Sequence, residues 1–422
     1  MPEKKCSYEG CGRDVYRGGD KCIFHCEEKD PQEFRNELAR QIRQWRNKGA
    51  GEWNFREWVF VDRQWEPNLF GRAVFPVNTV FGGAKFQTLA CFVSARFKGF
   101  AFFNLAQFTK HASFGAAQFT GDVNLYHASF AVSANLTNVT TTGLVRLIWR
   151  GEEIKAGRLL LKSLCFKSSP DGAQPLLDLR NNELREDRKL IIKNTDLSRV
   201  LLTRTDCRQI EFYNIPKWAE WKGRRAVADE VFLRNDPTRF GKKSSDKEEF
   251  DTPSWDEIAI TYQQLVANFR KELDHPLAND FERGLFEARL MAAKEKGDWK
   301  NEWLLGFYKC ASDFSGSIWR PAYRLLSVIL VCAIIYAGLL YGRELAWSAS
   351  GIGNVIFKGL IAALRVASLD RGWFSNEVDW TLVNNVPFRF VLTLVALLQT
   401  LFTAALVTLF IFSVRRRFKH SE

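Results

Sequence analysis

The sequence predicts a β-solenoid, then a helical region, and then two membrane-spanning helices. Large side chains recur at a constant spacing through residues 68–140, which is typical of a solenoid. Two long uncharged apolar runs lie near the C-terminus, and amphipathic helical patterns precede them. The 422 residues include 60 Lys and Arg against 48 Asp and Glu, and this basic balance predicts acidic partners, either nucleic acid or an anionic membrane surface.

The predicted solenoid depends on two interleaved series of large residues, each with a period of eleven. They are Phe70, Phe81, Phe92, Phe103, Phe114, Leu125 and Leu136, and Phe75, Phe86, Phe97, Phe108, Phe119 and Phe130. A small residue, usually Ala, stands two positions before nearly all of them. This period fits neither an amphipathic helix nor a simple strand. If four units make a turn, each turn takes 22 residues, and stacked turns bury the aromatic rings in ladders about 4.8 Å apart.

The run resembles the pentapeptide-repeat family, whose unit is A-(D/N)-L/F-x-x, in a variant with extra residues between units. The plain five-residue spacing returns at Leu197, Leu202, Cys207 and Phe212. The resemblance implies a right-handed quadrilateral β-helix over residues 52–218. Its first coil should contain the aromatic residues from Trp53 onward, and its coils after Leu144 should be enlarged.

Residues 1–28 carry a motif of metal-ligand type, Cys6-x4-Cys11-x10-Cys22-x2-His25. Two close pairs separated by a short loop suit a tetrahedral structural Zn²⁺ site. Cys26 is an alternative to His25 as the fourth ligand, and free thiols in a flexible tail are the alternative to a metal site. Zinc thiolates indicate a reducing compartment, hence the cytoplasm.

Helical segments are expected on both sides of the solenoid. Asp30-Pro31 should begin a helix within residues 29–51 that caps the first coil. Residues 219–253 are expected to form a linker. Ser254-x-x-Glu257 is a capping box that begins a helical hairpin over residues 254–310, with a break at His275-Pro276. The segment 278–281 is similar to the helical region before the membrane spans of membrane-anchored pentapeptide-repeat proteins.

Residues 311–422 predict a two-span membrane domain. Eighteen uncharged residues separate Arg324 from Arg343, and twenty-five separate Arg389 from Arg415, so both runs are long enough to cross a bilayer. Basic residues flank the start of the first run and the end of the second. They predict a multi-pass protein of the inner (plasma) membrane with both termini in the cytoplasm.

An amphipathic helix is expected between the spans, with Lys358 and Arg365 on one side. These cations would either favour anions in a pore or lie in water and headgroups on the outer membrane surface, and the second interpretation is favoured. No T-x-G-Y/F-G stretch of a potassium filter is present. In the second span, Gln399, Thr400 and Thr403 predict a polar partner from another helix, and therefore a homo-oligomer.

The sequence shows no catalytic motif, so neither enzyme activity nor a small-molecule substrate is expected. The favoured hypothesis is an oligomeric, channel-like or membrane-perturbing effector, consistent with a bacterial defence or stress protein, whose cytoplasmic solenoid senses or docks a partner. The alternative is a non-conducting platform, anchored among membrane lipids, that binds a protein, nucleic acid or anionic lipid. A DNA mimic would need an acidic solenoid, and residues 68–140 carry five Lys and Arg against Asp122 alone.

Overall fold

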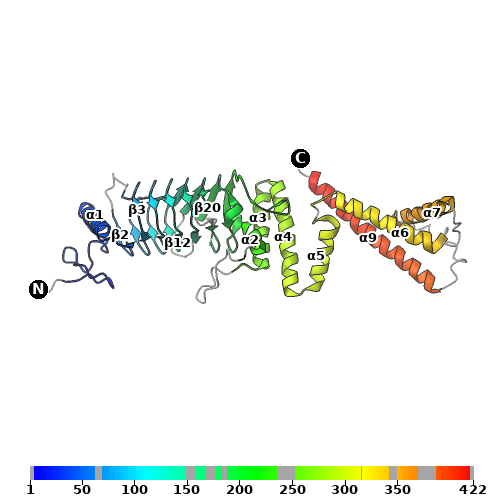
Figure 1. The fold of residues 1–422 in the computed structure, drawn as a ribbon, viewed down its shortest axis with the longest axis horizontal. Coiled ribbons are helices and arrows are strands. Elements are labelled where there is room, and N and C mark those ends of the chain that lie inside the picture. The colour runs from blue at the N-terminus through cyan, green and yellow to red at the C-terminus, as the bar shows by residue number, and fades with distance from the viewer. Residues whose placement is uncertain are drawn as a thin grey trace. The chain divides into compact units, whose positions relative to one another are not determined.

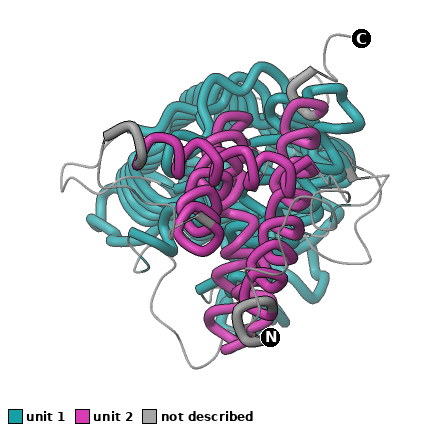
Figure 2. The backbone as a smooth tube through the Cα atoms, turned by 90° about the vertical axis from the view of Figure 1, so that its right-hand side faces the viewer, with its two compact units in different colours: residues 1–288 teal, residues 289–422 magenta. Residues whose placement is uncertain are grey.

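The computed structural model describes residues 4–61, 69–148, 157–167, 176–182, 184, 188–235, 237, 252–314, 316–341, 349–368 and 386–418. Two compact units divide the chain, Met1–Ala288 and Arg289–Glu422 (Figure 2). The first unit contains the β-strands, and the second contains long helices (Figure 1).

The first unit is a parallel β-solenoid with four sheets, as predicted (Figure 1). In spatial order, the seven-stranded sheet holds β1 (Glu52–Asn54), β4 (Asn78–Val80), β8 (Ala101–Phe102), β12 (Val123–Tyr126), β16 (Val145–Ile148), β19 (Leu177–Asp178) and β21 (Val200–Leu201). The six-stranded sheet holds β22 (Ile210–Tyr213), β20 (Arg188–Lys193), β17 (Gly157–Lys162), β14 (Ser133–Thr137), β10 (Ala112–Ser113) and β6 (Ala90–Cys91).

The other two faces have shorter strands. The five-stranded sheet holds β18 (Cys165–Phe166), β15 (Thr140–Thr141), β11 (Gln118–Phe119), β7 (Arg96–Phe97) and β3 (Val74–Phe75). The four-stranded sheet holds β13 (Ser129–Phe130), β9 (Gln107–Phe108), β5 (Lys85–Phe86) and β2 (Val59–Phe60). Two short 3₁₀ helices, Leu197–Arg199 and Cys207–Gln209, lie in the last coils.

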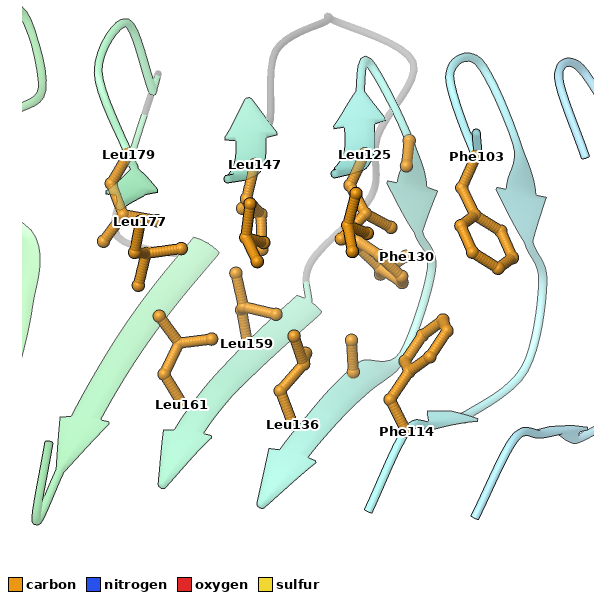
Figure 3. Packing of buried hydrophobic residues seen from close by; sticks show 14 of the residues in the cluster. Phe103, Phe114, Leu125, Phe130, Leu136, Leu147, Leu159, Leu161, Leu177 and Leu179 are labelled. Carbon is orange, nitrogen blue, oxygen red and sulfur yellow. The ribbon is translucent and has the colours of Figure 1, made fainter. Parts of the chain in front are cut away.

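The register confirms the 22-residue turn. Phe75 lies opposite Phe97, and Phe97 lies opposite Phe119. Their rings stack with centroids 4.4 and 4.8 Å apart, and all three side chains are buried. Farther along the solenoid, leucines replace the rings, and the strands β17 and β20 lengthen to six residues (Figure 3). The enlarged coils expected after Leu144 are therefore present.

Backbone conformation repeats with the same period. One residue in the left-handed region recurs every eleven positions, at Arg72, Gly83, Ser94, Leu105, Ala116, His127 and Asn138. At another corner Gly99, Gly121 and Gly143 stack, and a Cβ on Gly121 would lie 2.7 Å from backbone atoms of Gly99. The backbones of successive turns therefore approach too closely there for any side chain.

A helix covers the start of the solenoid, as expected. The helix α1 (Pro31–Asn47) begins at Asp30, whose carboxylate accepts hydrogen bonds from the N–H groups of Gln32 and Glu33. Its buried Phe34 packs edge-on against Phe60 of the first coil, with ring centroids 5.9 Å apart. This aromatic contact protects the open end of the solenoid from water.

The prediction of a linker over residues 219–253 is wrong for its first part. The strands β23 (Ala219–Trp221) and β24 (Arg224–Ala226) form an antiparallel pair, and α2 (Ala228–Asn235) follows. Buried Asp229 accepts hydrogen bonds from the N–H groups of Leu202 and Thr203 in the last coils. The charged part of the predicted linker, 241–251, lies outside the described residues.

Two helices complete this end of the first unit. They are α3 (Trp255–Lys271), which begins with the predicted capping box, and α4 (His275–Lys296), which continues into the second unit. The buried Arg224 guanidinium donates hydrogen bonds to Glu230 and Glu287, each at 2.8 Å, so these buried charges are paired.

In its described residues, the second unit has three long helices after α5. A two-helix hairpin is predicted over 254–310, but the structure has a third helix in this range, α5 (Trp299–Ser312). Gly297, in the left-handed region, ends α4, and Asp298 caps α5. The others are α6 (Trp319–Tyr341), α7 (Ala349–Ala367) and α9 (Val386–Phe418).

Candidate metal centre and polar contacts of the long apolar helices

The structure brings the four predicted metal ligands together. The Sγ and imidazole N atoms of Cys6, Cys11, Cys22 and His25 all lie within 4.8 Å of one another. His25 Nδ1 is 3.3 Å from Cys22 Sγ and 3.6 Å from Cys6 Sγ. All four cysteines of this N-terminal segment are free thiols, and Cys26 lies outside the group, with its Sγ facing the Glu28 carbonyl. Three thiols and one imidazole could therefore hold a metal ion.

The surroundings act differently on the individual ligands. Burial raises the pKa of the Cys22 thiol to about 12. Burial also acts to raise the pKa of the Cys6 thiol, but hydrogen bonds from the N–H groups of Cys22 and Tyr8, together with those of the Cys11 and Cys22 side chains, lower it overall. Burial also lowers the pKa of His25, which keeps the imidazole neutral. A thiolate and a neutral imidazole are the forms that coordinate a cation.

The centre is anchored to the first coil of the solenoid. The Val59 N–H donates to the Phe24 carbonyl at 2.8 Å, and Phe24 stacks on Trp58 with centroids 3.9 Å apart. The Lys29 ammonium donates to the carbonyls of both Ile23 and Val59. His25 and Cys22 are 6% and 1% exposed, so the centre is closed and has the character of a structural site.

In the second unit, two helices are long and apolar enough to cross a membrane, Trp319–Leu340 and Phe390–Arg415. Large apolar side chains on them face outward, including Ile334 at 68% exposure and Leu401 at 60%. Such an apolar outer surface is suited to lipid.

The helix α7 packs against both of these helices. A Cβ on Gly359 would lie 2.4 Å from the Ala333 carbonyl oxygen, so α7 and α6 are in backbone contact. Ala362 and Ala363 are buried in one cluster with Tyr336 of α6 and with Leu392 and Ala396 of α9. One face of α7 is therefore buried against the C-terminal half of α6 and the N-terminal half of α9. The favoured interpretation, in which Lys358 and Arg365 lie in water and headgroups on the outer membrane surface, stays a prediction.

Gln399 finds a partner within its own chain. Its Nε2 donates to the Ala363 carbonyl of α7 at 2.8 Å, whereas the sequence pointed to another subunit. Thr400 donates to the Ala396 carbonyl of its own helix. Gln399 Oε1 and Thr403 Oγ1 are buried and have no hydrogen-bond partner within the described part of the chain.

The two cations of α7 border its buried face. Lys358 and Arg365 are both partly exposed, two helical turns from each other on α7. The sequence could not show the contact of Gln399 with α7, because 36 residues separate Gln399 from Ala363. A signal was present in Gly359 and Ala363, two small residues four positions apart in an apolar segment, which is a spacing typical of close helix packing.

The sequence matches no protein-family model, no curated protein and no solved structure. The function is therefore inferred from the contacts described above.

Proposed function

We propose that this chain is an integral protein of the inner (plasma) membrane and acts as an oligomeric, channel-like effector with a cytoplasmic solenoid that senses or docks a partner. The observation that carries the proposal is the packing of α7 against the C-terminal half of α6 and the N-terminal half of α9, so that three helices share one buried cluster. A static anchor needs only the spans, whereas a third helix between them builds a unit that can line a passage.

The N-terminal centre is proposed to hold Zn²⁺ in a structural role. Three Cys and one His in a closed, buried cluster form a donor set that zinc favours. The structural role is inferred from the hydrogen bond between the Val59 N–H and the Phe24 carbonyl, which joins the segment carrying the ligands to the first coil of the solenoid. Zinc thiolates would favour a reducing compartment, which supports a cytoplasmic position for this end of the chain. Arg320 and Arg324 before the first span and Arg415 after the second support the same side for both termini.

Membership of the pentapeptide-repeat family remains part of the proposal. It is supported by four parallel faces, a 22-residue turn and inward ladders of large and small residues. The basic outer surface of the solenoid argues against DNA mimicry and for an acidic partner.

We base the proposed homo-oligomer on two polar atoms of α9, Gln399 Oε1 and Thr403 Oγ1, which are buried and have no hydrogen-bond partner among the described residues. They lie near the middle of the second span, and an unpaired polar group in hydrocarbon is costly. Because both atoms are buried within the chain, a second copy or water would reach them only if the helices rearranged on assembly.

Ion flux from liposomes that contain the full-length protein tests the channel. We expect flux with a preference for anions, because Lys358 and Arg365 are the cations of α7. Lys358→Glu should shift the preference toward cations, whereas Lys300→Glu on the exposed surface of α5 should not. Absence of flux under all conditions, including addition of acidic partners, would contradict the channel.

A second candidate is the non-conducting anchored platform. Its support is the wide six-stranded face, where Arg158 lies opposite Lys189 and Lys162 lies opposite Lys193. Like charges directly opposite each other are unfavourable. Glu211 of the next strand already pairs with Lys189 at 3.0 Å, so an acidic partner would chiefly relieve Lys162 and Lys193. Lys162→Glu together with Lys193→Glu should then abolish partner binding and leave the α-helical unit unchanged.

A further inference from the structure

Two adjoining pockets lie in the second unit and share Cys310, Arg324 and Ser327. The larger, of about 610 Å³, is an open pocket between α5 and α6, where three basic residues lie among mainly apolar lining surface. The smaller, of about 310 Å³, is lined almost entirely by apolar side chains of α5, α6 and α9. Together they form a basic chamber that opens into an apolar slot.

The basic chamber has the chemistry of a phosphate site. Lys309, Arg320 and Arg324 line it together with the hydroxyl-bearing Tyr323 and Ser327, and none of its lining residues is acidic. Arg320 pairs with Asp313 at 3.4 Å, and Arg324 is exposed and has no ion pair within the described ranges. Guanidinium groups bind phosphate oxygens through two parallel N–H donors, so Arg324 is available for an anion.

The apolar slot distinguishes the ligand from a free phosphate. Phe307 of α5 and Phe402 of α9 form part of its wall, with centroids 6.1 Å apart, and Val328, Val331 and Leu406 continue it. Each CH₂ group buried there contributes about 0.8 kcal/mol, which inorganic phosphate cannot gain. A zwitterionic headgroup brings its own cation, which three basic side chains would repel.

We propose that this double pocket binds an anionic phospholipid, with the phosphate against Lys309, Arg320 and Arg324 and one acyl chain in the slot beside the contacting rings of Phe307 and Phe402. The inference rests on the proposed membrane insertion of α6. The basic chamber occupies the first turns of the span Trp319–Leu340, where headgroups meet hydrocarbon. Trp319 and Tyr323, both exposed, lie at the same level as interfacial anchors.

The test uses the full-length protein in detergent with phosphatidylglycerol or with phosphatidylcholine of the same acyl chains, and lipid retention is measured by native mass spectrometry. We expect selective retention of phosphatidylglycerol. Arg324→Gln should weaken it roughly tenfold, as for loss of a charge-assisted hydrogen bond. Val331→Trp should lower retention by filling the slot without altering charge. Lys300→Gln, exposed on α5 outside both pockets, is the matched control and should bind as the unaltered protein does.

Three results would overturn the proposal. Equal retention of both lipids would show only non-specific lipid contact. Unchanged retention in both Arg324→Gln and Val331→Trp would place the lipid elsewhere. Full competition by inorganic phosphate would show that the site recognises only an anion and that the acyl chain does not contribute to binding. Resistance of the protein to carbonate extraction is measured first. Extraction into the soluble fraction would contradict membrane insertion and with it this site. If the protein resists extraction but the lipid-retention test fails, only the lipid site is contradicted.

Discussion

At the scale of single residues, the position of α7 depends on Gly359 and Gln399. Gly359 allows the α7 backbone to reach the Ala333 carbonyl, and Gln399 donates to the carbonyl of Ala363. Small residues and interhelical amide hydrogen bonds are the usual means of helix association in an apolar solvent, where burial of apolar surface supplies little.

Replacement of Gly359 by Ala should weaken the packing of α7. The added Cβ would lie 2.4 Å from a backbone oxygen and 2.8 Å from the Ala337 Cβ, and neither can move without separating the helices. We expect a loss of about 1–3 kcal/mol in the free energy of unfolding, measured by denaturant titration in detergent micelles. Gly353→Ala on the same helix has no atom within 4 Å of its Cβ and should be neutral or slightly stabilising. Equal effects of the two changes would contradict the contact.

Gln399→Leu should lower the stability of the second unit by about 0.6–1.7 kcal/mol, the range of hydrogen bonds between membrane helices. The reason is the loss of the bond to Ala363. The midpoint of thermal unfolding in detergent measures this change. A simultaneous change in subunit number, measured by light scattering, would show that Oε1 also bonds between copies. If neither the thermal midpoint nor the subunit number changes, the hydrogen bond contributes no measurable stability.

At the scale of elements, the solenoid was largely predictable because its core repeats. Phe75, Phe97 and Phe119 fall into one ladder by arithmetic on the sequence alone, and the structure confirms it. The left-handed residues with the same period were not predictable, because Gly occupies only position 83 and the others include Arg72, Leu105 and Ala116. Tertiary packing of the corner, rather than local preference, holds these residues at positive φ.

The terminal cap of the solenoid was missed for a related reason. Arg224, Asp229 and Glu230 are charged residues in a polar stretch, which normally indicates an exposed segment. Here they are buried because each has a partner: Asp229 accepts from the Leu202 N–H, and Arg224 pairs with Glu230. Pairing between distant residues carries no periodic signal, so only the structure identifies it.

Phe97→Ala should destabilise the solenoid by about 3–5 kcal/mol, as for a buried aromatic residue whose cavity cannot collapse. Its ring stacks on both Phe75 and Phe119, so the cavity would interrupt a continuous ladder. Chemical denaturation followed by circular dichroism measures the change. Leu105→Ala is the control, since Leu105 is 57% exposed in an adjacent repeat unit, and it should cost far less. Similar losses for both variants would contradict the ladder.

At the scale of the whole molecule, covers at both ends make the solenoid a closed body. The N-terminal segment with the candidate metal ligands and α1 pack on the first coil, and α2, α3 and their ion pairs pack on the last coils. An uncovered solenoid exposes unpaired strand edges and an apolar core, which promotes aggregation. The ligand motif and the Asp30 cap were predictable because they are local in sequence. Anchoring of the metal segment to Trp58 and Val59 was not, because it depends on contacts across about 35 residues.

Removal of the metal should therefore open the N-terminal segment and loosen the first coil, but leave later turns folded. With a strong chelator, hydrogen exchange should increase in peptides covering 5–28 and 52–60, and remain slow in peptides covering 90–140, whose strands bond only to neighbouring turns. Cys22→Ser should reproduce this pattern and lose about one zinc per chain by elemental analysis, as expected for a tetrahedral site. Cys26→Ser should retain the metal, because Cys26 Sγ lies outside the cluster. Unfolding of the entire solenoid on chelation would instead show that the first coil supports all the others, and an unchanged metal content in Cys22→Ser would contradict the ligand set.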